Sequence, residues 1–136
     1  MTKRLWRLNV LSEFSAAHAL RAYQGKCENL HGHNYKVEMC VEGARLVEQT
    51  EFVMDFSLLK KMLKEELDWL DHKNINDLEP FTRINPTSEN IACFLYQRMK
   101  ERLDACPVAL RSITVWETDK QSATYMEMEG EQGGGF

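Results

Sequence analysis

The stretch that decides the fold is residues 31–42, His-Gly-His-Asn-Tyr-Lys-Val-Glu-Met-Cys-Val-Glu. Its odd-numbered positions carry histidine, aromatic or aliphatic side chains, and most of its even-numbered positions carry polar ones. Alternation with a period of two is typical of a strand that buries one face. The sequence therefore predicts a half-buried strand here, with His31 and His33 on the same face.

A second strand of the same kind is predicted upstream, in residues 5–18. Its even-numbered positions from Trp6 to His18 form a mostly apolar face, and a loop from about Leu20 to Glu28 follows it. If the two strands pair across this loop as an antiparallel hairpin, His18 reaches the same point as His31 and His33.

Two amphipathic helices are predicted next. Asp55 or Ser57 can cap the first, whose apolar stripe comprises Leu58, Leu59, Met62, Leu63, Leu67 and Leu70. A loop rich in Asn and Asp separates it from the second helix, which opens at residues 85–90 and ends before Pro107. Thr87 or Ser88 can cap this second helix, and its buried side comprises Ile91, Phe94, Leu95, Met99 and Leu103.

Two final strands are predicted at residues 112–118 and about 124–129. The order is therefore strand, strand, helix, helix, strand, strand (ββααββ), which predicts an α+β fold with an antiparallel sheet and both helices on one face. We expect one domain over residues 1–130. The glycine run near the C-terminus predicts a flexible tail over residues 131–136.

The composition argues against several other classes of protein. A formal net charge of −4 is unlike the basic face of a nucleic-acid binder, although it allows a small anionic ligand. No run of about 18 apolar residues and no secretory h-region is present, so we expect no membrane span and a cytoplasmic location. In that reducing compartment, most of the four cysteines are expected to be free thiols: Cys27, Cys40, Cys93 and Cys106.

Three of the four histidines in the chain are predicted to converge. His31 and His33 leave one face of a strand, and His18 ends the apolar face of the strand that pairs with it. Three neutral imidazoles suit Zn²⁺ and leave a fourth position open for water or substrate, as in catalytic zinc sites. A histidine pair at this spacing also arises by chance, as ordinary hydrogen-bonded strand residues.

Cys27 leaves the chemistry of this site open. It lies four residues before His31, so it could be a fourth ligand that closes a structural zinc site. It could instead be a nucleophile or base beside the metal, because a nearby Zn²⁺ lowers the pKa of a thiol and favours the thiolate. The spacing does not decide between these alternatives.

Two acidic positions add candidate site residues. Glu117 shares strand parity with Ile113 and Val115, and a carboxylate that ends an apolar face needs a binding partner. Asp71 and His72 are adjacent, and from the residues alone His72 is best explained as a helix C-terminal histidine that interacts with the helix dipole.

Five segments, in order along the chain, resemble the motifs of the 6-pyruvoyl-tetrahydropterin synthase family. Cys27 to Tyr35 is similar to the CxxxHGH signature of its 6-carboxy-tetrahydropterin synthases, and Phe14 to His18 to the setting of its first zinc ligand. The other three segments are Leu70 to Asn76 (LDHxxLN), Asn85 to Asn90 (NPTSE) and Val115 to Thr118 (VxET). The matches span residues 14–118, and their order is far more specific than any one motif.

The resemblance implies the tunnelling fold, in which protomers join antiparallel sheets edge to edge into a barrel. It also implies a homo-oligomer, usually a hexamer built as a dimer of trimers, with active sites at subunit interfaces. A barrel of this kind would cover exposed sheet edges, which proteins otherwise have to protect.

The resemblance also implies a role for each matched residue. His18, His31 and His33 would bind zinc, and Cys27 would be the general base. His72, oriented by Asp71, would be the second proton-transfer group. Glu117 would bind the guanidine-like edge of the pterin, whose two N–H donors suit a bidentate carboxylate.

Other matched residues have weaker assignments. Thr87 and Ser88 would be helix caps, pterin contacts or both, and Asp55 would be a structural cap. A triphosphate substrate needs cations, and Arg21, Lys26 and Lys73 lie in or beside the motif loops, although each can also be a solvated charge.

The short spacing between Cys27 and His31 favours 6-carboxy-tetrahydropterin synthase on the queuosine/7-deazapurine route. The implied reaction converts 7,8-dihydroneopterin triphosphate into 6-carboxy-5,6,7,8-tetrahydropterin, with loss of acetaldehyde and triphosphate. Glu28 to His33 also fits an ExxHGH pattern, in which Glu28 would be the base and the product would be 6-hydroxymethyl-dihydropterin for folate synthesis. Further alternatives are 6-pyruvoyl-tetrahydropterin synthase activity and a non-catalytic pterin- or zinc-binding protein.

Overall fold

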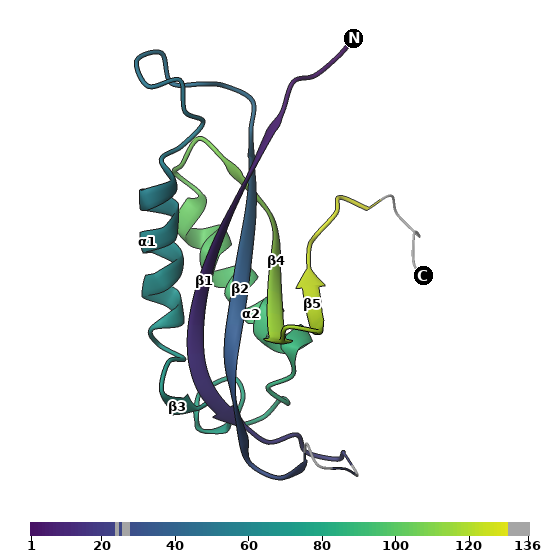
Figure 1. The fold of residues 1–136 in the computed structure, drawn as a ribbon. Coiled ribbons are helices and arrows are strands. Elements are labelled where there is room, and N and C mark those ends of the chain that lie inside the picture. The colour runs from purple at the N-terminus through teal and green to yellow at the C-terminus, as the bar shows by residue number, and fades with distance from the viewer. Residues whose placement is uncertain (24, 26–27, 131–136) are drawn as a thin grey trace.

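The computed structural model of the chain describes residues 1–23, 25 and 28–130. One sheet runs through it, with the strand order β3-β1-β2-β4-β5. Two helices, α1 (Phe56–Leu67) and α2 (Ser88–Leu103), lie against one face of this sheet (Figure 1). None of the helices in the described part of the chain is long and apolar enough to span a bilayer.

The long hairpin of β1 (Trp6–His18) and β2 (His31–Gly43) forms the centre of the sheet. The strands pair antiparallel along their whole length, from Trp6 opposite Gly43 to His18 opposite His31. Val10, Phe14, Tyr35 and Val37 are buried beneath the helices, as the alternation of the sequence predicts. The predicted hairpin is therefore confirmed.

Helix α1 begins where its cap was predicted. The Asp55 carboxylate accepts a hydrogen bond from the backbone N–H of Ser57 at 2.8 Å, which satisfies one free donor of the first turn. Leu59, Leu63 and Leu67 recur every four residues and are fully buried, so they fix the face that packs on the sheet.

Helix α2 is likewise capped as predicted, because Thr87 Oγ1 accepts from the backbone N–H of Asn90 at 3.1 Å. It packs mainly against β4 (Ala109–Thr118) and β5 (Gln121–Tyr125). A nearly buried carboxylate, Glu66 of α1, joins the two helices by accepting from Arg98 at 3.0 Å and forming an ion pair with Arg102 at 2.9 Å.

The structure corrects two predicted elements. The segment expected to be only a loop contains β3 (Lys73–Asn74), which pairs parallel to β1 and makes the sheet mixed, and then a short 3-10 helix (Ile75–Asp77). A two-residue strand is too short for its alternation to be seen in a sequence.

The last strand was predicted too late in the chain. It is Gln121–Tyr125 rather than residues 124–129, because Thr118 pairs directly with Gln121 and leaves only a two-residue turn. Asp119 and Lys120 form that turn without the glycine that usually marks it. The predicted tail at 131–136 lies outside the described residues.

Candidate metal centre

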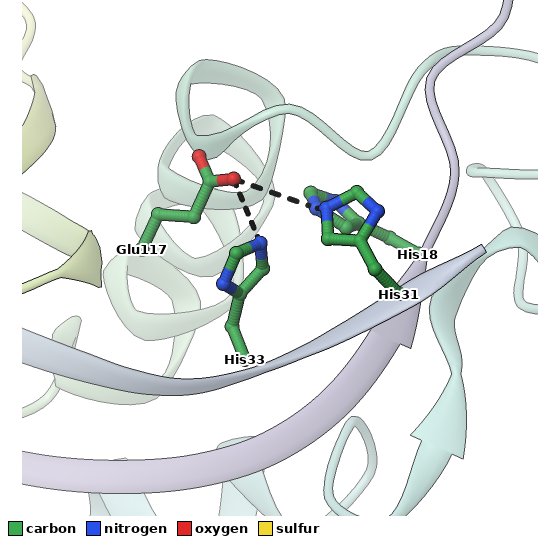
Figure 2. A group of neighbouring side chains, drawn as sticks. All are labelled: His18, His31, His33 and Glu117. Carbon is green, nitrogen blue, oxygen red and sulfur yellow. Dashed lines mark hydrogen bonds and ion pairs between the residues drawn. The ribbon is translucent and has the colours of Figure 1, made fainter. Parts of the chain in front are cut away.

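The three histidines meet at the end of the hairpin, on the face that the helices cover (Figure 2). His18 is the last residue of β1 and His31, its cross-strand partner, is the first of β2. His33 lies two residues further along β2, opposite Ala16. The convergence predicted from strand parity is therefore confirmed, and it follows from the register of one hairpin.

Glu117 from the end of β4 completes the cluster (Figure 2). One potential ligand atom from each of His18, His31, His33 and Glu117 lies within 4.8 Å of the others. Glu117 Oε1 is 2.9 Å from His33 Nε2 and 3.6 Å from His18 Nε2. The sequence predicted Glu117 to bind a ligand but did not predict that it would face the histidines.

Backbone carbonyls determine which nitrogen of two imidazoles faces the cluster. His18 Nδ1 lies 2.7 Å from the carbonyl oxygen of Pro86, and His31 Nδ1 lies 2.7 Å from that of Asn29. A carbonyl oxygen only accepts, so each Nδ1 carries the proton and donates. In the neutral rings, both Nε2 atoms therefore present lone pairs to the cluster.

These lone pairs form an arrangement that a cation would satisfy. His18 Nε2 and His31 Nε2 are 3.0 Å apart, too close for two neutral acceptors without a positive charge between or beside them. His33 Nε2 is buried and makes no well-directed hydrogen bond, even though Glu117 Oε1 lies near it. Three imidazole nitrogens and a carboxylate are ligands that divalent transition metals prefer, so the residues fit a metal ion.

Burial keeps these imidazoles in the form that binds metal. Desolvation lowers the pKa of His18 below its ordinary value, more strongly than its Pro86 hydrogen bond and the Glu117 charge raise it. Desolvation likewise lowers the pKa of His33, against the opposing effect of Glu117. Both rings are therefore neutral at neutral pH, as a metal ligand must be.

The start of α2 holds the other oxygen of Glu117. Ser88 Oγ, in the first turn of the helix, donates to Glu117 Oε2 at 3.2 Å. The positive end of the helix dipole favours a carboxylate at this place. Ser88 is therefore a contact of Glu117, while Thr87 uses its hydroxyl oxygen to cap the helix.

Asp71 and His72 form a pair at the edge of β1. Asp71 Oδ2 lies 2.9 Å from His72 Nδ1, while its Oδ1 accepts from the backbone N–H of Ser15 at 2.8 Å. That second contact is the main reason why the pKa of Asp71 is lowered. His72 is a non-glycine residue with a φ of 57°, and its side chain is 82% exposed. The geometry is that of a carboxylate that orients an accessible imidazole.

The structure does not bring this pair to the histidine cluster. His72 borders an open cleft of about 420 Å³, whose lining includes Ser15, Ala17, Gly32 and Asn34 together with His33 of the cluster. Ser15, Ala17 and Asn34 alternate with the cluster residues along β1 and β2, so their Cα–Cβ bonds leave the opposite face of the sheet.

The remaining predicted site residues are placed as follows. Cys27 and Lys26 lie outside the described residues, and Glu28 is exposed in the loop before β2. The guanidinium of Arg21 donates to the carbonyls of Ile84 and Phe81, and Lys73 Nζ donates to that of Trp69. Arg21 therefore has a structural role in this state.

Sequence reasoning missed the residue beneath the cluster. Tyr35 is fully buried on the same face as His33, and its ring lies 5.8 Å from that of His18 and 5.4 Å from that of His33. Burial, followed by the negative charge of Glu117, raises the pKa of its phenol above its ordinary value. A polar tip on an otherwise apolar strand face was the available signal.

The fold and the cluster together define a small α+β domain with a candidate mononuclear metal centre at the end of a β-hairpin. Comparison with known proteins identifies the family. The family described as 6-pyruvoyl tetrahydropterin synthase matches residues 7–128. The chain belongs to this family, and it is an enzyme of the lyase class that the family represents.

Individual relatives carry different names at similar identity. The chain is 36% identical to the dihydroneopterin monophosphate aldolase of Pyrococcus furiosus, covering 82% of this chain and 89% of the relative. It is also 36% identical to the 6-carboxy-5,6,7,8-tetrahydropterin synthase of Synechocystis, covering 89% and 93%. The solved 6-pyruvoyl tetrahydropterin synthase of Caenorhabditis elegans is 30% identical, with a TM-score of 0.81 and coverage of 94% and 99%.

Proposed function

We propose that this chain is a zinc-dependent lyase that converts 7,8-dihydroneopterin triphosphate and one water molecule into 6-carboxy-5,6,7,8-tetrahydropterin, acetaldehyde and triphosphate. The observation that carries the proposal is the convergence of His18, His31 and His33 with Glu117 at one point. The queuosine/7-deazapurine route, in the cytoplasm, is the pathway that uses this product. The Synechocystis relative, at 36% identity, carries the name of this activity.

The three histidines would hold the metal through Nε2, because backbone carbonyls engage Nδ1 of His18 and His31 and His33 Nε2 faces the same point. Bound zinc would supply Lewis acidity, which makes the neighbouring C–H and O–H groups of the pterin side chain easier to deprotonate. Glu117, held by Ser88, would accept the paired N–H donors of the pterin ring and orient it against the cluster. Thr87 lies beside this position as the cap of α2.

The Asp71–His72 pair would act as the second proton-transfer group, with Asp71 fixing the orientation and tautomer of the imidazole. Because the pair is not part of the cluster of its own chain, we propose that it serves the cluster of a second copy. A hexamer built as a dimer of trimers, with the sheets joined into a barrel, would provide such shared sites and cover the sheet edges.

The general base separates two possible products. Cys27 as the base corresponds to the 6-carboxy product. Glu28 as the base corresponds to cleavage of the side chain to 6-hydroxymethyl-dihydropterin. The exposed position of Glu28 leaves it accessible, and a relative named as an aldolase matches at the same identity of 36%. This second function therefore stays a candidate.

The deciding experiment incubates zinc-loaded protein with 7,8-dihydroneopterin triphosphate and identifies the products by mass spectrometry, with a chelated control. We expect 6-carboxy-5,6,7,8-tetrahydropterin and acetaldehyde. Formation of 6-hydroxymethyl-dihydropterin would instead support Glu28 as the base. Formation of a 6-pyruvoyl product would show 6-pyruvoyl-tetrahydropterin synthase activity. Absence of any zinc-dependent product would contradict the enzymatic proposal and favour a pterin- or zinc-binding protein.

A Cys27→Ala variant separates a catalytic thiol from a structural ligand. We expect turnover to be lost while zinc content and fold are retained. Loss of zinc together with the fold would instead identify Cys27 as a fourth ligand of a closed structural site.

A further inference from the structure

Tyr35 lies beneath the histidine cluster and has no role in the proposed reaction. Its side chain is 0% exposed, and its ring stacks on Phe14 of β1 at a centroid distance of 4.7 Å. The rings of His18 and His33 lie roughly perpendicular to it, at centroid distances of 5.8 Å and 5.4 Å. The tyrosine ring therefore packs beneath two of the candidate ligands.

The hydroxyl of Tyr35 has no acceptor among the described protein atoms. Tyr35 Oη and His33 Nε2 are the two buried side-chain polar atoms, in the described part of the chain, that lack a hydrogen-bond partner. Tyr35 and His33 are two residues apart on one face of β2, so the two atoms that lack a hydrogen-bond partner belong to neighbouring side chains. An unpaired buried hydroxyl is costly, and Phe14 shows that a ring without a hydroxyl fits this layer.

Glu117 is the acceptor that the strand register brings beside Tyr35. Lys36 pairs with Trp116 and Val37 with Val115, so continuing the register by one residue puts Tyr35 opposite Glu117, on the buried face. The carboxylate uses one oxygen toward His33 and the other toward Ser88. A carboxylate has about four lone-pair positions, so it retains acceptor capacity.

We propose that Tyr35 is a positioning residue for Glu117, donating its phenolic proton to a buried water molecule that in turn donates to the carboxylate. A buried water needs two to four polar partners, and the phenol and the carboxylate supply two of them. The bridge keeps Glu117 pointing at the histidines, where it can receive the ligand. The expected effect of Tyr35 on pterin binding rests on the proposed function, in which Glu117 binds the pterin ring.

The first test compares Tyr35→Phe with Tyr125→Phe, which removes a hydroxyl that donates to Glu127 at 2.7 Å, outside the cluster. We expect Tyr35→Phe to keep the zinc affinity and the thermal midpoint, and to weaken binding of the probe 7,8-dihydroneopterin to zinc-loaded protein roughly three- to tenfold. We expect Tyr125→Phe to leave probe binding unchanged. Unchanged probe binding in Tyr35→Phe would overturn the proposal.

A double-mutant cycle tests whether the hydroxyl acts through Glu117. In a Glu117→Gln background, Tyr35→Phe should have little further effect on probe binding, because the group that it positions has already been altered. Equal losses in both backgrounds would mean that the phenol acts directly on the ligand or the metal, and the positioning role would be wrong.

A crystal structure of the zinc-loaded protein without a pterin tests the bridge independently of the proposed function. We expect an ordered water within hydrogen-bond distance of both Tyr35 Oη and the Glu117 carboxylate. A phenol that faces an apolar, dry space would overturn the proposal. If the water is present but the wild-type protein binds no dihydropterin, the proposed function fails while the positioning role stands.

Discussion

Backbone carbonyls determine which ring nitrogen of His18 and His31 can bind a metal. Each ring donates from Nδ1 to a carbonyl, of Pro86 and of Asn29 respectively, which leaves Nε2 as the inward atom. Such contacts orient a ligand and make it a better base, which raises metal affinity. Because the acceptors are main-chain atoms, their positions depend on the loops that precede α2 and β2.

Replacement of one inward imidazole should remove the metal without unfolding the chain. We expect His33→Ala to lower zinc affinity by at least about a hundredfold, since a lost ligand costs more than a lost supporting hydrogen bond. Competition with a chelating dye measures the affinity, and circular dichroism checks the fold. Lys36→Ala, on the opposite face of β2, is the matched control, and full zinc content in His33→Ala would contradict the ligand assignment.

The sequence predicts the histidine cluster well because its geometry follows from strand parity alone. His18, His31 and His33 share one face of one hairpin, so a period of two is enough to bring them together. The approach of Glu117 to His33, by contrast, depends on how β4 is aligned with β2. That alignment comes from tertiary packing and has no local sequence signal.

At the scale of elements, the turn after α1 places Asp71 and His72 beside β1. The backbone N–H of Ser15 donates to Asp71, and the backbone N–H of His72 donates to the carbonyl of Ser15 at 2.6 Å. The pair is therefore attached to the strand by two hydrogen bonds. The orientation of the imidazole consequently depends on the edge of the sheet.

An Asp71→Asn change should leave the fold and the zinc content intact, because an amide oxygen can still accept from Ser15. It should slow product formation by about 10² to 10⁴, since the amide does not hold the imidazole in the same tautomer. Steady-state kinetics measure the loss. A rate within twofold of the wild-type rate would show that the pair has no part in turnover.

The contact between the two helices depends on Glu66. We expect Glu66→Gln to lower the free energy of unfolding by about 1–2 kcal/mol, because it weakens two charge-assisted contacts of a nearly buried carboxylate, to Arg98 and Arg102. Lys64→Ala breaks only the exposed pair with Asp68 and should cost less than about 0.5 kcal/mol. Urea denaturation measures both, and equal losses would contradict this role of Glu66.

The segment after β5 is held to α2 by Glu127, which accepts from Tyr125 and Gln97 and pairs with Lys100. These contacts, led by that of Tyr125, lower the pKa of Glu127 to about 2. The stabilisation is present above the ordinary glutamate pKa of about 4.3 and is lost as the pH falls toward 2. Glu127→Gln should therefore reduce the change in the free energy of unfolding with pH in this range. Urea denaturation at several pH values measures this change. The same pH dependence in the variant and the wild type would contradict the assignment of this effect to Glu127.

Most elements could be predicted because their signals are local. The caps of α1 and α2 are single side chains, Asp55 and Thr87, that bond to the backbone within three residues. The strand β3 and the early start of β5 were missed because both are defined by their partners, β1 and Thr118. Pairing with a neighbour decides such elements, and local sequence carries little of that information.

At the scale of the whole molecule, the Asp71–His72 pair is not among the four residues that converge in the cluster of its own chain. Under the proposed function, this pair would serve the cluster of a second copy of the chain. Co-expression of a His33→Ala chain with a His72→Ala chain should restore activity in about a quarter of the sites, as random mixing in a symmetric oligomer predicts. Either chain alone should be inactive. An inactive mixture that forms mixed oligomers, as native mass spectrometry would show, would mean that each chain uses its own pair.

Zinc K-edge X-ray absorption of the metal-loaded protein tests the central claim most directly, because it identifies the ligand atoms. An open catalytic centre on His18, His31 and His33 predicts a first shell of nitrogen and oxygen only, with imidazole scattering and distances of about 2.0–2.2 Å. A sulfur scatterer at about 2.3 Å would reveal a closed site with a thiolate ligand, and would contradict a thiol that is free to act as a base.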